Sequence, residues 1–205
     1  MAIAPEKDPS SIRPTRDALE GFRGYYQAQG TWCWAAVASS VVRYYREQQG
    51  QTRSYPQCYF VGLQHPGPAC RHSKSKDSPH PHGEIDCFEN GCSIHDNPEI
   101  GRARAALDDD TIQVFGDILD RPIEWDMICN EINHDRPIII RTKNADASYH
   151  LLAIIGYDSD VPSIALWDPA MGIRIESYNA LQRRVGVWTH TVLTQPPGAG
   201  AFNIQ

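Results

Sequence analysis

The chain has 205 residues, of which 41% are hydrophobic and 21% charged, so it can bury the core of one domain. Asp and Glu outnumber Lys and Arg by 25 to 19, and the formal net charge of −6 argues against a nucleic-acid partner, which selects for a basic face. No uninterrupted apolar run reaches the roughly 18 residues of a spanning helix, so we expect no membrane span.

The N-terminal part divides into an arm and a helix. Residues 1–24 hold several prolines and glycines and no sustained period, which is typical of an arm or loop. From residue 31 to residue 49, apolar and small residues recur along one helical face. Thr31 is the expected N-cap and Gly50 the expected stop. The pattern predicts a central helix with Cys33 in its first turn.

The middle of the chain is irregular. Residues 51–97 contain many turn formers and almost no periodicity, which is uncommon unless a segment is functional, disordered or cross-linked. Beyond this segment the sequence predicts a short helix capped by Asn97 and running to Leu107, a strand at 111–115 and an amphipathic helix at 124–133.

The C-terminal third carries β-branched and aromatic runs separated by turn signals. The expected strands are 137–140, 149–157, 163–167 and 185–193. A helical half followed by a sheet-rich half predicts an α+β fold.

Cys33 is the sharpest chemical signal. A cysteine in the first turn of a helix lies at unpaired backbone N–H groups and the positive end of the helix dipole, which favours the nucleophilic thiolate. Gln27, shortly upstream, can aim its side-chain NH₂ at an oxyanion, with the Cys33 backbone N–H as second donor. The alternative is that Cys33 is a small buried hydrophobic residue.

A nucleophile needs a base, and His150 and Asp168 can complete the set. His150 opens one predicted strand and Asp168 ends the next. If the turn near residues 158–162 closes a hairpin, the carboxylate can accept a hydrogen bond from the imidazole. Taken singly, His150 can be a core histidine and Asp168 a turn-initiating Asp-Pro. Their occurrence in the order Gln, Cys, His, Asp favours a catalytic set.

The segment from Gln27 to Ala36 resembles the signature of bacterial papain-like cysteine peptidases, in which a glutamine stands six positions before Cys-Trp-Ala-Ala. These include secreted effector proteases of plant pathogens and relatives of the bacteriocin-processing peptidases. Residues 149–158 are similar to the family's histidine-bearing strand, and residues 167–169 to its Trp-Asp-Pro element. Pro137 before an Ile-rich strand is a further similarity.

The resemblance implies Cys33 as nucleophile, His150 as general base and acid, Asp168 as orienting group and Gln27 as oxyanion donor. No cofactor and no metal are implied. The sequence departs from the family at Tyr149, where glycine is common, and this tyrosine is expected to crowd the cleft or shape substrate choice. Gln29 is a second glutamine near the site, but Gln27 has the family spacing.

The implied architecture is a papain-like two-lobe fold with the cysteine on the central helix. We expect an arm at 1–24 and a peptidase domain at 25–205, with a helical lobe at about 25–110 and an antiparallel sheet lobe at about 111–195.

The implied function is a cysteine endopeptidase acting on a protein or peptide through a thioester, in the setting of a secreted bacterial effector or toxin. A cognate inhibitor or immunity protein is a further expected partner. A glutamine deamidase or transglutaminase using the same triad is the closest alternative. A binding module with inactive chemistry is a third, disfavoured because all four roles are filled.

The remaining cysteines leave two alternatives open. Four of the chain's six cysteines lie in the irregular segment, namely Cys58, Cys70, Cys87 and Cys92. They predict two disulfides, with Cys33 and Cys129 reduced, and hence an oxidising space outside the cytosol reached without a signal peptide. Zinc is the weaker alternative, because the spacings lack a two-residue knuckle, although His72, His80 or His82 could contribute.

Overall fold

The structure is a computed structural model that describes residues 17–52, 55–64, 100–183 and 187–198. Within them, seven strands form one antiparallel sheet in the order β2-β7-β3-β4-β5-β6, with β1 paired to β4. The strands are β1 Asp17–Ala18, β2 Phe115–Leu119, β3 Ile138–Lys143, β4 Tyr149–Asp158, β5 Ser163–Asp168, β6 Gly172–Ser177 and β7 Trp188–Thr194. The helices are α1 Cys33–Gln48, α2 Gln57–Gln64, α4 Ile100–Leu107, α5 Trp125–Asn133 and α6 Tyr178–Arg183.

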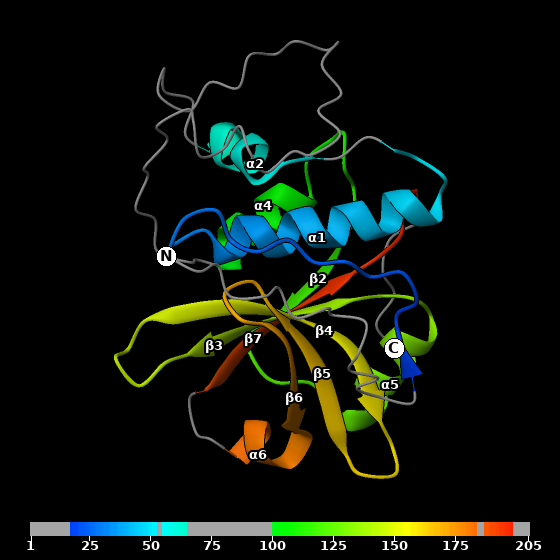
Figure 1. Ribbon diagram of the computed structural model, residues 1–205, viewed down its shortest axis with the longest axis vertical. Coiled ribbons are helices and arrows are strands. Elements are labelled where there is room, and N and C mark those ends of the chain that lie inside the picture. Colours follow the sequence, from blue (N-terminus) through cyan, green and yellow to red (C-terminus); the bar gives the residue numbers. More distant parts are fainter. Residues whose placement is uncertain (1–16, 53–54, 65–99, 184–186, 199–205) are drawn as a thin grey trace, which may run out of the picture.

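The three described helices nearest the N-terminus lie apart from the two that follow them in the chain. Figure 1 shows α1, α2 and α4 together on one side of the sheet, with α5 beside β4 and α6 at the end of β6. The α+β class predicted from the sequence is confirmed. The boundaries given for the arm and the two lobes stay predictions.

Helix α1 is the central helix that the sequence predicts. Twelve of its 16 residues are buried, which a helix rich in Ala and Ser can achieve because its neighbours approach closely on several sides. It ends as expected, with Gly50 at a φ of 70° that suits glycine. The predicted N-cap was wrong: Trp32, not Thr31, precedes the first helical residue, and Ala36 N donates to Trp32 O at 2.9 Å to close the first turn.

The predicted strand at 111–115 was also wrong, because turn chemistry takes over this stretch. Asp109 Oδ1 accepts from the backbone N of Thr111 at 3.0 Å and also from its hydroxyl, and Gln113 has a φ of 51°. Strand β2 therefore begins only at Phe115. The helix predicted at 124–133 is present as α5, and α4 ends at Leu107 as expected, while Asn97 lies outside the described residues.

Four elements were not predicted, among them β1 at Asp17–Ala18, within the residues expected to form an arm. Helix α2 lies inside the segment expected to be irregular, and β6 and α6 follow β5 where no element was expected. Four expected strands are present as β3, β4, β5 and β7, with shifts of one to three residues at their ends. Among the described residues, no helix is both long and apolar enough to cross a bilayer.

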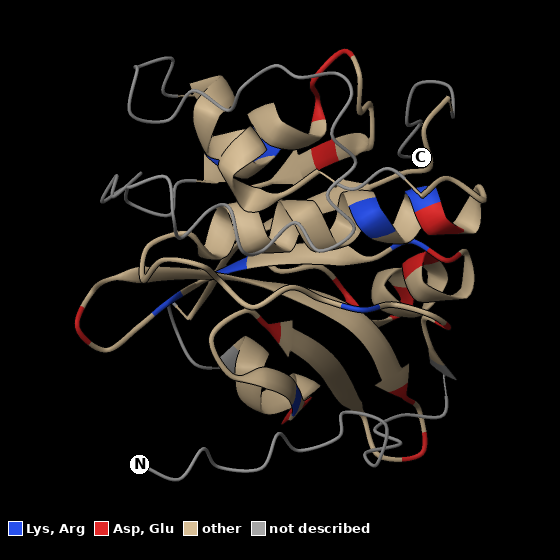
Figure 2. Cartoon of the chain, turned by 45° about the horizontal axis from the view of Figure 1, so that its top comes forward, with Lys and Arg blue, Asp and Glu red and all other residues tan. Residues whose placement is uncertain are grey.

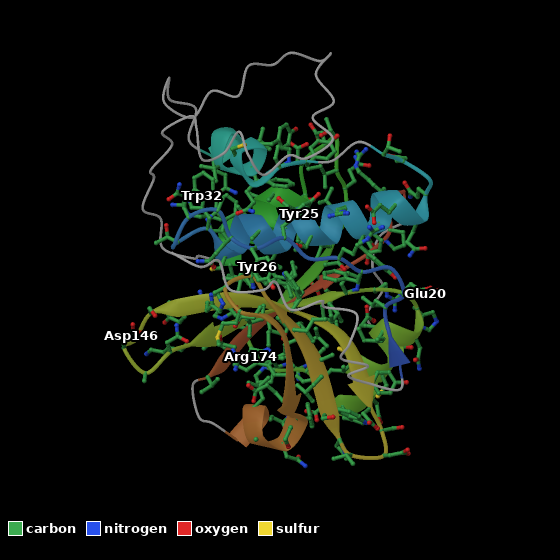
Figure 3. The ribbon with its side chains drawn as sticks, viewed as in Figure 1. Glu20, Tyr25, Tyr26, Trp32, Asp146 and Arg174 are labelled. Atoms are coloured by element: carbon green, nitrogen blue, oxygen red, sulfur yellow. The ribbon has the colours of Figure 1, made fainter. Side chains whose placement is uncertain are left out.

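A short segment before α1 joins the helices to the sheet. Figure 3 shows Tyr25 and Tyr26 between α1 and the sheet. Tyr25 N donates to Ser40 Oγ of α1 at 2.8 Å, and the Tyr26 ring meets the Trp167 ring of β5 edge-on with centroids 5.2 Å apart. The residues before Cys33 are thereby tied to both halves of the fold.

Charged residues of both signs follow one another toward the C-terminal end of α1, as Figure 2 shows. Arg43 Nε lies 2.8 Å from Glu47 Oε1 one turn on, and Arg23 reaches the same carboxylate at 3.9 Å. Such exposed pairs contribute little to stability, so the folding free energy comes from the buried side of the helix.

Gly24 gives the first testable prediction. A Cβ built there would lie 2.0 to 2.3 Å from the Trp167 ring, whereas one at Gly101 in α4 would meet nothing within 4 Å. We expect Gly24→Ala to lower the free energy of unfolding by roughly 1–3 kcal/mol, because the ring must shift. The matched Gly101→Ala should stabilise by about 0.5–1 kcal/mol, because alanine favours a helix. Urea denaturation of both variants checks this, and equal midpoints would contradict it.

Candidate active site

Cys33 is the first residue of α1 and is 2% exposed. The indoles of Trp32 and Trp34 on either side are fully buried, so the start of the helix is fixed by packing. Trp32 N donates to Gln29 O at 3.0 Å, which closes the turn that leads into the helix. The sulfur therefore lies where the N–H groups of the first helical turn have no partner within the helix.

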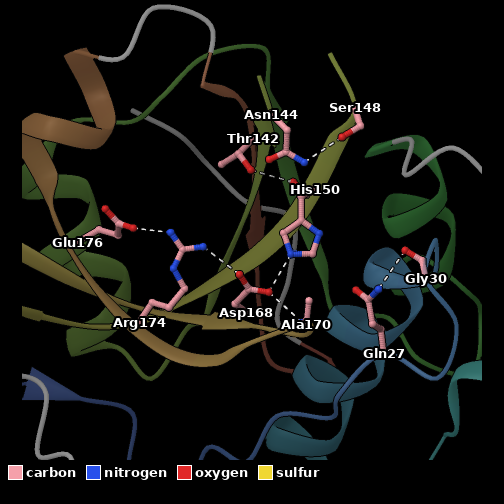
Figure 4. Close-up of polar contacts among 10 residues, drawn as sticks. All are labelled: Gln27, Gly30, Thr142, Asn144, Ser148, His150, Asp168, Ala170, Arg174 and Glu176. Atoms are coloured by element: carbon pink, nitrogen blue, oxygen red, sulfur yellow. Dashed lines mark hydrogen bonds and ion pairs between the residues drawn. The ribbon is translucent and has the colours of Figure 1, made fainter. Parts of the chain in front are cut away.

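His150 is the second residue of β4 and its side chain is 19% exposed. It is paired with Thr142 of β3, whose hydroxyl donates to the His150 carbonyl at 3.3 Å. The β3–β4 turn is closed by Asn144 N to Ser148 O at 2.8 Å and by Asn144 Nδ2 to Ser148 Oγ at 2.9 Å (Figure 4). The backbone that carries His150 is therefore held on the β3 side.

Asp168 is the last residue of β5 and is 2% exposed. Its Oδ1 accepts from His150 Nε2 at 2.8 Å and from Ala170 N at 2.8 Å, and its Oδ2 accepts from Arg174 Nη1 at 2.9 Å. Figure 4 shows these three donors converging on one carboxylate. The β4–β5 hairpin thus brings together the histidine and aspartate that the sequence singles out.

The imidazole of His150 lies between Asp168 and Cys33. Asp168 occupies Nε2, so Nδ1 is the ring nitrogen that remains for the neighbouring Cys33 side chain. Burial lowers the pKa of His150, but the hydrogen bonds with Asp168 and Cys33 outweigh it and raise the pKa to about 9. The site favours a charged imidazolium at neutral pH.

Asp168 stays ionised despite its burial. Burial raises the pKa of the carboxyl, but hydrogen bonds from His150 and the Ala170 N–H, with Arg174 beyond, bring the pKa down to about 2. Because the carboxylate is charged at every working pH, it can hold the ring of His150 in one orientation.

Gln27 lies beside the start of α1, where the family spacing predicts an oxyanion donor (Figure 4). Its backbone N donates to Pro169 O at 2.8 Å, which ties it to the turn after Asp168. Its side-chain Nε2 donates to Gly30 O at 3.0 Å, and the second hydrogen of this NH₂ group is available to a ligand. Gln29 contributes its backbone carbonyl to the turn before Cys33.

Tyr149 has a partner on β3, and the expectation that it crowds the cleft or shapes substrate choice stays a prediction. Successive residues of a strand face opposite sides of the sheet, so Tyr149 points away from the side that carries His150. The Arg141 guanidinium lies over the Tyr149 ring, 4.4 Å from its centroid. The tyrosine therefore packs against β3.

Arg174 and Glu176 extend the polar network and were not predicted. Arg174 binds Asp168 through Nη1 and Glu176 through Nη2, so the arginine lies between two carboxylates of the β5–β6 pair. The signal for them was in the sequence: residues 172–177 alternate isoleucine with charged residues, the period of a strand. Recognising β6 would have placed Arg174 beside Asp168.

Of the five cysteines other than Cys33, the structure describes two, Cys58 and Cys129. Among the described cysteines, Cys33 and Cys129 form no disulfide, as expected. Cys58 is disulfide-bonded, whereas Cys70, Cys87 and Cys92 lie outside the described residues, so the predicted pairing of the four stays a prediction. His72, His80 and His82, named for the zinc alternative, also lie outside them. Within the described ranges no three His, Cys, Asp or Glu side chains gather as a metal site.

Residues 19–192 match the Peptidase_C39 like family. Because the match covers most of the chain, this protein belongs to that family, and the predicted enzyme class, a papain-like cysteine protease, is confirmed. A protein or peptide is accordingly its class of substrate. No curated protein matches the chain in sequence.

Solved structures of bacterial proteins resemble the fold. Xylellain, a cysteine protease from Xylella fastidiosa, aligns with a TM-score of 0.53 and 11% identity over 94% of this chain and 90% of its own. The peptidase domain of Streptococcus ComA, a bifunctional ABC transporter of a quorum-sensing pathway, gives 0.48 and 13% over 85% and 98%. The Pseudomonas avirulence protein AvrPphB gives 0.32 and 12% over 87% and 100%. At such identities the likeness to xylellain shows the fold alone, and with it the papain-like fold predicted from the sequence is confirmed.

The pKa of His150 leads to a prediction of pH dependence. Loss of the imidazolium removes the acid for the leaving amine, so peptide hydrolysis should fall as the pH rises through about 9. Asp168→Asn removes a carboxylate that raises this pKa, so we expect the alkaline limb to move to lower pH and kcat to fall more than KM rises. A kcat/KM profile of both proteins measures it. An alkaline limb at the same pH in the variant would remove Asp168 from this role.

Proposed function

We propose that this protein cleaves internal peptide bonds through a thioester on Cys33, with His150 as general base and acid, Asp168 as orienting group and Gln27 as oxyanion donor. The observation that carries the proposal is the position of one imidazole, which hydrogen-bonds Asp168 at 2.8 Å and lies near enough to Cys33, at the start of α1, for that side chain to raise the pKa of His150. Nucleophile, base and orienting group in one chain of contacts are what covalent acyl transfer requires.

In the first half-reaction the sulfur of Cys33 attacks the carbonyl carbon of the scissile bond, and the thiol proton resides on His150. The carbon–sulfur bond forms as the carbonyl electrons move to oxygen, and the oxyanion accepts hydrogen bonds from the Gln27 NH₂ and the Cys33 backbone N–H. When the tetrahedral intermediate collapses, the carbon–nitrogen bond breaks and His150 gives its proton to the leaving amine.

In the second half-reaction His150, now neutral, takes a proton from water as the water oxygen attacks the thioester carbon. The oxyanion forms again on the same donors, the carbon–sulfur bond breaks, and the sulfur leaves as thiolate beside the imidazolium. The products are a carboxylic acid and an amine, and the resting thiolate–imidazolium pair is restored.

We further propose that the protein acts as an effector or toxin in an oxidising space outside the bacterial cytosol, and that a cognate inhibitor or immunity protein restrains it inside the producing cell. The disulfide at Cys58 supports the first part, because thiols are kept reduced in most cytosols. A protease that recognises peptide bonds also endangers its host, which motivates the second part.

A library of defined peptides tests the proposed hydrolysis. We expect wild-type protein to cut peptides at internal bonds and Cys33→Ala to cut none, while Cys129→Ala, which removes the other free thiol, keeps wild-type rates. Mass spectrometry of the products separates the alternatives. An intact backbone that gains about one dalton at glutamine would identify a deamidase instead. No change of any peptide by wild-type protein would contradict an active enzyme.

The cysteine prediction is tested by the intact mass of the unreduced protein. Two disulfides among the four middle cysteines remove four hydrogens, so the mass should lie about 4 Da below that of the fully reduced chain. Two thiols, Cys33 and Cys129, should remain open to alkylation. A fully reduced mass with one equivalent of bound zinc would make the metal alternative correct and weaken the case for export.

A further inference from the structure

Gln57 stands out among the buried polar side chains because its amide bridges two backbone groups next to the active site. It is the first residue of α2 and is 4% exposed. Its Oε1 accepts from Ala28 N at 2.9 Å, and its Nε2 donates to Tyr26 O at 2.8 Å. Between those two backbone groups lies Gln27.

The bridge needs a side chain that both donates and accepts. Among the uncharged side chains only an amide offers a carbonyl and an NH₂ in one rigid plane, and glutamine has the reach to place both on the neighbouring segment before α1. The hydrogen bond to Ala28 N is buried and the one to Tyr26 O is partly buried, so losing them would deprive a buried backbone N–H and a partly buried C=O of these partners. The segment would then relax toward other contacts.

The position of Gln27 is defined by tethers from three sides. Gln57 holds the residues before and after it from α2, Pro169 O accepts from its own backbone N, and Ser40 of α1 holds Tyr25. Of these three, Gln57 is the one that is hydrogen-bonded to the residues on both sides of Gln27. It therefore sets the rotation of the Gln27 backbone and with it the direction of the Gln27 side chain.

We propose that Gln57 is a positioning residue, which orients Gln27 so that its NH₂ group meets the oxyanion that forms during acyl transfer. The inference rests on the proposed function, since it assigns the oxyanion to Gln27. An oxyanion donor acts only when it lies within hydrogen-bond distance of the developing charge, and misplacement by about 1 Å costs on the order of 10²-fold in rate. A residue that never contacts substrate can thus control turnover.

The test compares Gln57→Met with Gln64→Met, because Met keeps the length of the side chain and removes its hydrogen bonds. Gln64 is a matched control at the other end of α2, where it donates to Arg102 O at 2.7 Å. The substrate is a quenched fluorescent peptide taken from the library profile. We expect Gln57→Met to lower kcat about 10- to 100-fold with KM within about twofold, and Gln64→Met to change neither.

Alkylation of Cys33 by iodoacetamide distinguishes positioning from general damage. This reaction displaces iodide from a saturated carbon and forms no oxyanion, so Gln57→Met should alkylate at the wild-type rate. Gln27→Ala alone should lose about 10²–10³-fold in kcat, and adding Gln57→Met to it should cost nothing more. Loss of alkylation in step with kcat, or two losses that multiply in the double variant, would overturn the proposal.

The outcomes keep this inference separate from the proposed function. If no peptide is cut in a way that depends on Cys33, the proposed hydrolysis fails before Gln57 is tested. If cleavage depends on Cys33 and Gln57→Met turns over at the wild-type rate, the hydrolysis stands and the positioning role of Gln57 is wrong.

Discussion

The buried carboxylate of Asp168 is the constraint on which the rest of the site depends. A charge that is 2% exposed is tolerated only if its oxygens are hydrogen-bonded, and here the donors come from β4, from the turn after β5 and from β6. Satisfying the charge therefore requires the two hairpins to pair in one register, since a shift of one residue would turn His150 or Arg174 to the opposite face. The interaction that orients the base also fixes the sheet.

The second requirement is that the N-terminus of α1 lies beside the part of the sheet that carries His150 and Asp168. α1 can approach closely because its buried face consists largely of alanine, serine and valine, and the tryptophans around Cys33 fix its first turn. The segment that contains Tyr25 and Gln27 lies between the two halves and is hydrogen-bonded to both, to Ser40 on one side and Pro169 on the other. Cys33 and His150, far apart in sequence, are thereby positioned by packing rather than by a flexible loop.

The sequence predicted those parts of the site that depend on local pattern. Cys33 at a helix start and Asp168 at the end of a strand could be located because periodicity marks helices and strands, and the hairpin brought His150 to Asp168. Arg174 was within reach, since β6 alternates apolar and charged residues. Gln57 was not: a glutamine in a segment without periodicity resembles any surface residue, and its burial arises from tertiary contact with residues 26–28. The strand expected at 111–115 failed because side-chain hydrogen bonds from Asp109 favoured a turn.

The two sides of the site use different chemistry, and electrostatics explains the division. The sheet carries the charged groups, in which His150, Asp168 and Arg174 alternate in sign, while the helical side offers neutral amides through Gln27 and Gln57. A cationic donor in place of Gln27 would stabilise negative charge on the Cys33 sulfur as well as on the oxyanion, and interactions that favour ground state and transition state equally do not raise kcat. A neutral amide held in place by a second neutral amide favours the state in which the carbonyl oxygen carries the charge. A rigidly placed neutral donor can thus stabilise the transition state more than the ground state, whereas a charged donor would stabilise both.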